Sequence, residues 1–152
     1  MKKGIVIVAI CICVFFTCFG CEKKTEKKTA GEDGSVTMSA TLTEDDKTTL
    51  ECTIVNKSKK DIVTGEEYSL QVLEDKSFVD VPLLPEAGAF NLVSMDILSG
   101  NEYSFRAYIE EKYGDLEAGR YRIVKEYTNK EKGSQKEENA DKETVSAEFD
   151  LP

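Results

Sequence analysis

Cysteine thiols and carboxylates are the groups in this 152-residue chain that could do chemistry, because the sequence contains no histidine. A nucleophilic thiol needs a neighbouring base, and the most common such base is the residue that the chain lacks. Cys52 also lies in an alternating segment whose apolar side is expected to face inward. We therefore interpret Cys52 as a packed core thiol and predict no catalytic residue.

Two acidic runs could hold an ion or hydrolyse a glycoside. Glu44-Asp45-Asp46 and Glu110-Glu111 offer the oxygen ligands that Ca²⁺ prefers, but neither lies in an Asp-x-Asp-x-Asp-Gly loop. Glycoside hydrolysis needs two carboxylates held across a cleft, which a small domain rarely provides. Solvated turn residues are the favoured interpretation, and no metal or other cofactor is expected.

The N-terminus has the order of a secretory signal. A basic start at Met1-Lys2-Lys3 precedes an apolar run over residues 5–16, which is short for a membrane span of roughly 20 residues. Gly20-Cys21 at its end resembles the bacterial lipoprotein signal, in which the cysteine is acylated, for example with palmitate, and becomes the new N-terminus. The resemblance implies a signal peptide over residues 1–20 and lipidation of Cys21. An uncleaved anchor and an ordinary secretory signal remain the alternatives.

Removal of this signal changes the charge and leaves one thiol. Loss of Lys2 and Lys3 lowers Lys plus Arg from 20 to 18 against 29 acidic residues, for a net charge of −11. Such an acidic chain is a poor partner for nucleic acid, so the predicted membrane contact is the lipid anchor. Residues 21–34 are predicted to combine the lipidated cysteine with a flexible linker. Cys52 would then have no disulfide partner.

Residues 35–152 read as short strands separated by turns. Apolar side chains alternate with polar ones over residues 36–42, 48–55, 67–74, 103–109, 120–127 and 145–151. Shorter strands are expected at residues 77–81 and, less regularly, at residues 90–98. Pro82 and Pro85 mark a crossing loop, and the polar residues 128–143 suggest a long hairpin loop. No amphipathic helical run competes, so the pattern predicts an all-β domain.

The segment Leu116-x-x-Gly119-x-Tyr121 predicts a tyrosine corner, in which a tyrosine hydroxyl bonds to the backbone a few residues upstream. Leu116 would plug the turn, and Gly119 would permit a tight bend. In an antibody-type domain this corner precedes the second core cysteine by two residues. Ile123 stands there, Cys52 stands where the first cysteine would lie, and the chain has no tryptophan. An immunoglobulin-like β-sandwich of about seven strands is therefore predicted, with Tyr68 replacing some of the missing tryptophan volume.

Several of these runs together resemble a bacterial immunoglobulin-like domain family. They are Asn56-Lys57-Ser58, Gly65-Glu66-Glu67-Tyr68-Ser69-Leu70, Tyr113-Gly114-Asp115-Leu116 and Gly119-Arg120-Tyr121-Arg122-Ile123-Val124-Lys125. The resemblance implies an envelope location and brings no established catalytic residues.

Alternation also separates core from surface. Tyr103 and Tyr121 are expected to face inward, whereas Arg106 and Tyr108 fall on the opposite face and form the candidate partner surface. Arg120 and Arg122 are expected to pair with nearby acids. We expect a monomeric, lipid-anchored, extracytoplasmic module that binds an unknown protein or glycan without catalysis. The alternative is a ligand-sensing or inhibitory accessory lipoprotein that regulates an envelope enzyme or receptor.

Overall fold

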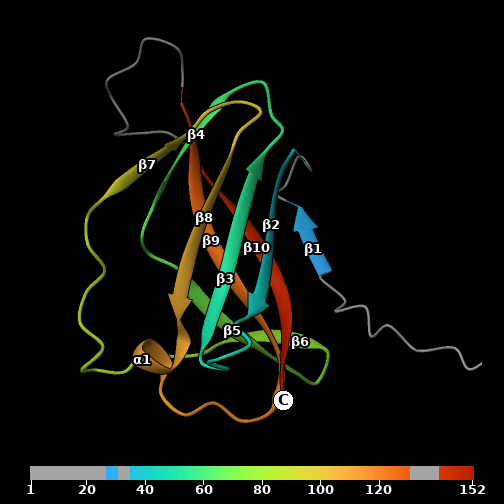
Figure 1. The fold of residues 1–152 in the computed structure, drawn as a ribbon, viewed down its shortest axis with the longest axis vertical. Helices are drawn as coiled ribbons and strands as arrows, with labels where there is room; N and C mark the ends of the chain where they lie inside the picture. Colours follow the sequence, from blue (N-terminus) through green and yellow to red (C-terminus); the bar gives the residue numbers. More distant parts are fainter. Residues whose placement is uncertain (1–26, 31–34, 131–140) are drawn as a thin grey trace, which may run out of the picture.

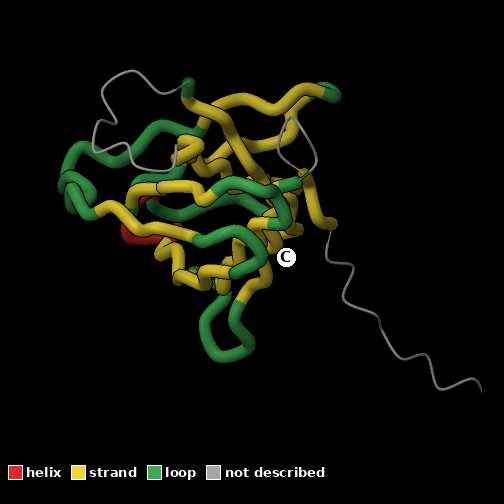
Figure 2. The backbone as a smooth tube through the Cα atoms, turned by 90° about the horizontal axis from the view of Figure 1, so that it is seen from above, coloured by secondary structure: helices red, strands yellow, loops and turns green. Residues whose placement is uncertain are grey.

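The protein is a sandwich of two antiparallel layers of strands (Figures 1 and 2). The computed structural model describes residues 27–30, 35–130 and 141–152. Its elements are β1 (Lys27–Ala30), β2 (Val36–Leu42), β3 (Thr49–Asn56), β4 (Asp61–Gly65), β5 (Ser69–Glu74), β6 (Ser77–Asp80), β7 (Ser94–Ile97), β8 (Glu102–Tyr108), α1 (Ile109–Tyr113), β9 (Gly119–Lys130) and β10 (Lys142–Leu151). The prediction of an all-β, immunoglobulin-like sandwich is confirmed.

Hydrogen bonding defines the two layers. The first layer has the order β2-β3-β8, and the second is built around the long β9–β10 hairpin. The strands β4 and β5 both pair with β9. On their other edges, β4 pairs with β7 and β5 pairs with β6. β1 pairs with both β10 and β2 and so joins the layers at one side. The opposite side of the first layer ends at β8.

The core lies between the layers and follows the alternation of the sequence. In β2, β3 and β9, buried side chains alternate with more exposed ones over most of each strand. Cys52 and Ile123 lie in this core, 1% and 0% exposed, at the positions where a disulfide would stand in an antibody domain. Burial raises the pKa of the Cys52 thiol to about 12, so it remains protonated at neutral pH.

Two elements at the start and end of the chain extend further than the sequence suggests. β1 falls inside the predicted flexible linker, and that prediction is wrong for residues 27–30, because a polar segment can still pair through its backbone with two neighbouring strands. The rest of the linker, and the signal peptide with Cys21, lie outside the described residues. The predicted hairpin loop is also shorter, since β9 reaches Lys130 and β10 begins at Lys142.

Local signals failed at two further points. β4 was not predicted, and residues 90–93 of the irregular strand lie outside β7. Residues 109–113 form the short helix α1, where alternation alone suggested the end of a strand. The backbone of Gly114 after it has φ 78°, which a glycine adopts without strain. Gly114 rather than Gly119 therefore provides the unusual turn geometry, because Gly119 already belongs to β9.

Tyr121 has the geometry of a tyrosine corner. Its hydroxyl donates a hydrogen bond of 2.8 Å to the carbonyl of Glu117, four residues upstream. The ring is 4% exposed and stacks on Phe149 with a centroid separation of 5.8 Å. Leu116 packs partly buried against the core below the turn. The corner thus fastens the crossing between the layers to the first residues of β9.

Replacement of Tyr121 by Phe should lower the free energy of unfolding by about 1–3 kcal/mol, because it leaves the Glu117 carbonyl without its donor. Tyr108→Phe is the matched control on an exposed ring, and it should change the stability by about 0.5 kcal/mol or less. Urea unfolding of both variants measures the difference. Equal losses would show that the Tyr121 hydrogen bond does not stabilise the fold.

Candidate binding surface on the edge strand

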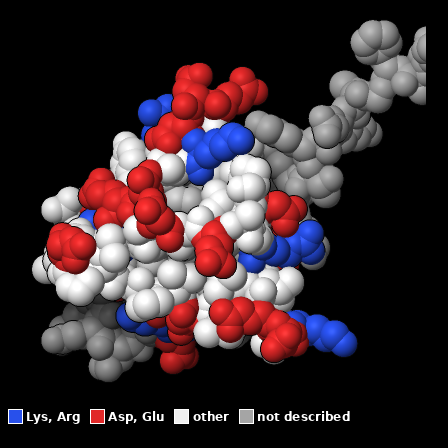
Figure 3. All heavy atoms as spheres, turned by 90° about the horizontal axis from the view of Figure 1, so that it is seen from below, with Lys and Arg blue, Asp and Glu red and all other residues white. Residues whose placement is uncertain are grey.

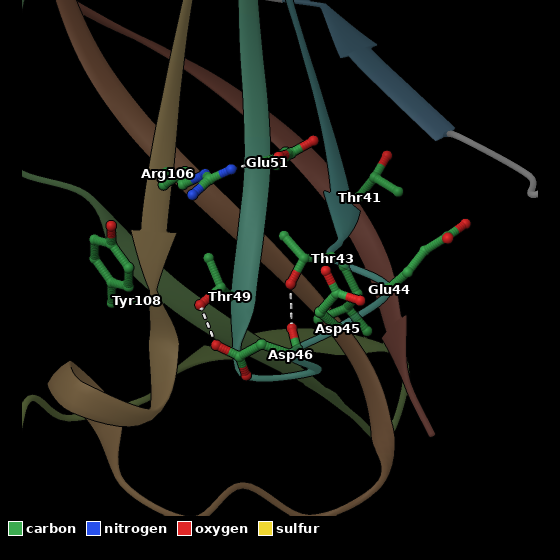
Figure 4. A pocket seen from close by; sticks show the side chains of 10 residues that line it. Thr41, Thr43, Glu44, Asp45, Asp46, Thr49, Glu51, Arg106 and Tyr108 are labelled. Atoms are coloured by element: carbon green, nitrogen blue, oxygen red, sulfur yellow. Dashed lines mark hydrogen bonds and ion pairs between the residues drawn. The ribbon is translucent and has the colours of Figure 1, made fainter.

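The predicted partner residues lie on the outer face of β8, the last strand of its layer. Tyr108 is 50% exposed, and Arg106 forms an exposed ion pair of 3.2 Å with Glu51 on β3. Both residues line a cavity of about 470 Å³ at the end of the layer. Figure 4 shows Arg106 reaching toward Glu51, with the turn that carries the acidic residues along one side of the cavity.

That turn, which carries Glu44, Asp45 and Asp46, is held by its own hydrogen bonds. The Asp46 carboxylate accepts bonds of 2.8 Å from the Thr48 backbone and 2.7 Å from the Thr49 hydroxyl. Hydrogen bonds from the side chains of Thr48 and Thr49 lower the Asp46 pKa. Within the described residues, no group of three or more potential ligands is placed to hold a metal ion. This arrangement is that of a turn stabilised by side-chain capping.

The inner side of β8 faces a bulge between β4 and β5. Thr64 pairs with Tyr127 and Ser69 with Val124, so residues 65–68 lie opposite only residues 125–126. The two extra residues turn backbone carbonyls inward, where the Lys125 ammonium meets them. Its Nζ donates to the carbonyl of Gly65 and, at 3.0 Å, to that of Glu67. The bulge is therefore held by a buried lysine.

Lys125 is a cation inside an aromatic environment. The residue is 1% exposed, and its Nζ lies 4.7 Å from the centroid of the Phe105 ring. Burial lowers the Lys125 pKa to about 8, with Cys52, Glu66 and Glu67 partly opposing that shift. Two carbonyl dipoles and one ring face satisfy this ammonium, in place of a direct ion pair.

A second cavity, of about 270 Å³, opens beside β8 above this lysine. Aromatic rings form much of its wall, and residues 89–91 of the crossing loop lie on its far side. Cations outnumber acids in its lining, which includes Lys112, Lys125, Arg106 and Glu66. Its volume lies just below the roughly 300–1,000 Å³ of typical small-molecule sites, so it fits a side chain or a small ligand.

Sequence reasoning did not single out Lys125, although alternation contained the signal. Tyr121, Ile123, Lys125 and Tyr127 occupy successive inward positions of β9, and all are buried. A lysine in such a position indicates a buried acceptor. Tyr103 was predicted to be a buried core residue because it faces inward, and this holds only in part. An inward side chain on an edge strand has a neighbouring strand on one side only, so its other side stays exposed. The Tyr103 ring is half-buried and stacks on Phe105 at 6.0 Å.

The flanking arginines have different partners. Arg120 pairs with Asp150 at 3.0 Å, as expected. Arg122 instead donates to the side-chain oxygen of Gln71 and lies 4.3 Å from the centroid of the Phe78 ring. Arg122 has two cross-strand neighbours, Glu148 on β10 and Gln71 on β5, and contrary to expectation its hydrogen bond goes to Gln71 rather than to an acid. Figure 3 shows acidic side chains spread widely over the end of the molecule that it displays.

Together these elements define an immunoglobulin-like sandwich with an exposed edge strand and two adjoining cavities, a class of domain that typically serves interaction rather than catalysis. The model of the bacterial Ig-like domain family matches residues 32–150, and the chain belongs to this family. No curated protein matches the sequence. Among the described residues, no helix is long and apolar enough to cross a membrane.

The buried Lys125 should give stability a distinct pH dependence. Its pKa is lowered in the folded state, so the unfolded chain binds more protons between about pH 8 and 10, and raising the pH relieves the cost of burying the charge. The free energy of unfolding of the wild type should therefore rise over this range relative to that of Lys125→Met. Urea unfolding at several pH values measures the difference. The titration of Cys52 and of the tyrosines affects the wild type and the variant alike, so it cancels in the comparison. Parallel profiles of unfolding free energy against pH would contradict the interpretation.

Proposed function

We propose that the protein is a lipid-anchored, extracytoplasmic module that binds a protein or glycan partner through the outer face of β8, without catalysis. The observation that carries this proposal is the exposed pair Arg106 and Tyr108 beside a cavity of about 470 Å³. A half-exposed tyrosine next to an arginine is typical of residues that dominate binding energy. The acids around the cavity favour a partner that is neutral or basic at the contact.

Anchoring rests on Gly20-Cys21 after the apolar run. Two acyl chains give stable membrane attachment, and the segment before β1 then links the domain to the membrane surface. The outer face of β8 would be presented to the extracytoplasmic space.

The second candidate function is ligand sensing or inhibition of an envelope enzyme or receptor. The cavity of about 270 Å³ above Lys125 favours it, because a small bound group there would contact both β8 and the bulge. A titration of small anionic and aromatic ligands, followed by the fluorescence of the lining tyrosines, would test this candidate separately from partner capture.

Cys21→Ser should abolish acylation and leave the precursor unprocessed, whereas Cys13→Ser, in the apolar run and away from the processing position, should leave both steps intact. Mass spectrometry of the N-terminal peptide from membrane fractions measures both outcomes. An unmodified Cys21 in the wild-type protein would overturn the proposed anchor.

Partner capture tests the binding surface directly. The soluble bait should comprise residues 22–152, because β1 pairs with β2 and β10 and belongs to the folded domain. A specific partner from solubilised envelope should bind at low salt and weaken at high salt. Arg106→Ala combined with Tyr108→Ala should abolish capture.

The matched control is Arg120→Ala combined with Asp150→Ala, which removes an exposed ion pair from the other layer. This control should retain capture. Equal loss in both double variants, or turnover of a glycan, peptide or ester by the bait, would contradict the proposal.

A further inference from the structure

The free edge of β8 is an unusual feature of this sandwich. Immunoglobulin-like domains commonly carry a fourth strand in this layer. Here the order ends at β8, and the segment between β6 and β7 contains Pro82 and Pro85, which cannot donate to a strand ladder. Within the described residues, no strand pairs with the outer edge of β8.

The register shows which backbone groups point off this edge. Ile109 donates to Thr48 and Asn56 donates to Asn101, which places the odd-numbered residues of β8 in hydrogen-bonded pairs with β3. The backbone groups of Glu102, Ser104 and Arg106 therefore point away from β3. Further along the same edge, the Tyr108 carbonyl accepts a bond of 3.4 Å from the Tyr68 hydroxyl.

We propose that this edge pairs with β8 of a second copy of the chain, in an antiparallel arrangement centred on Ser104, so that the two first layers become one continuous sheet. The strand is self-complementary about this residue. In this register Glu102 lies opposite Arg106 of the second copy and Arg106 lies opposite its Glu102, which forms two cross-strand charge pairs. Ser104 lies opposite itself.

The inner face of the strand is complementary in the same register. Tyr103 lies opposite Phe105 of the second copy, and the reciprocal pair forms across the two-fold axis. These odd-numbered residues would be non-hydrogen-bonded pairs, in which side chains approach most closely and aromatic contacts stabilise a sheet. Both rings are only half-buried in the single chain.

The aromatic residues on the inner side of this edge also line the cavity of about 270 Å³ beside β8. Partly exposed aromatic side chains at an unpaired strand edge favour association. Pairing of two short strands buries less than the 1,200–2,000 Å² or so of stable interfaces, so the dimer is weak in dilute solution and favoured at high local concentration.

Disulfide trapping tests this register in the soluble chain 22–152, which contains the complete core. A hydrogen-bonded antiparallel pair has Cα atoms about 5.5 Å apart, within the range that a disulfide spans. Ser104→Cys should therefore form a homodimeric disulfide at least about ten-fold faster than Ser77→Cys, an exposed serine on the edge strand β6. Equal rates for the two purified variants would overturn the pairing of two copies.

Charge reversal in the Ser104→Cys background provides a second and independent readout. Glu102→Arg and Arg106→Glu should each slow trapping about ten-fold, because each places two like-charged pairs across the axis. The double variant should restore the original rate. Rescue of the Arg106→Glu variant cannot come from Glu51, because the double variant lacks the partner Arg106 as well. Absence of rescue in a double variant with unchanged circular dichroism would contradict the proposed register.

Self-pairing is distinct from partner capture. Trapping uses the purified chain alone, so it can fail while an envelope partner is still captured through Tyr108, and capture can fail while trapping succeeds.

Discussion

The rest of the structure depends on the Lys125 ammonium and the two backbone carbonyls that it binds. A four-residue bulge inside a sandwich leaves carbonyl groups without ladder partners, and an unsatisfied buried carbonyl costs about 1–3 kcal/mol. Lys125 satisfies those of Gly65 and Glu67 together. The bulge can then place Tyr68 in the core, where its ring contacts Phe90 at 4.9 Å. One buried cation therefore allows the strand to change register and fill the interior.

The same arrangement explains how the domain holds together without the disulfide of antibody domains. Hydroxyl and amide groups reach buried carbonyls across the core, as Tyr113 does to Tyr68 at 3.0 Å and Asn56 to Ile97 at 3.0 Å. No buried side-chain polar atom in the described part of the chain lacks a partner. Because each of these bonds joins segments about 40 residues apart, they link distant strands as a disulfide would, while Cys52 contributes only its packing.

How far the sequence could predict this structure depended on whether the signal was local. Period-two alternation located β2, β3, β8, β9 and β10, because one face of each strand is buried. The spacing from Leu116 to Tyr121 predicted the corner, which closes within five residues. By contrast, β4 and the bulge depend on carbonyl acceptors some 60 residues from Lys125. β1 pairs with β2, the next strand, and with β10 at the far end of the chain, and its polar composition contains no trace of either partner.

The candidate site also combines features that local sequence signals predict with features that depend on distant segments. Alternation along the strand placed Arg106 and Tyr108 outward, but it could not show that β8 lies at an edge. The edge position arises because residues 81–93 form no strand that pairs with β8. Pro82 and Pro85 interrupt pairing, the first layer ends early, and β8 presents side chains on two faces and backbone groups on its edge. A second copy on the edge would bury Tyr103 and Phe105 yet leave the outer ring of Tyr108 accessible. Self-pairing and partner binding would share Arg106, whose side chain pairs with Glu102 of the second copy, so the two uses of β8 compete at Arg106 and not at Tyr108.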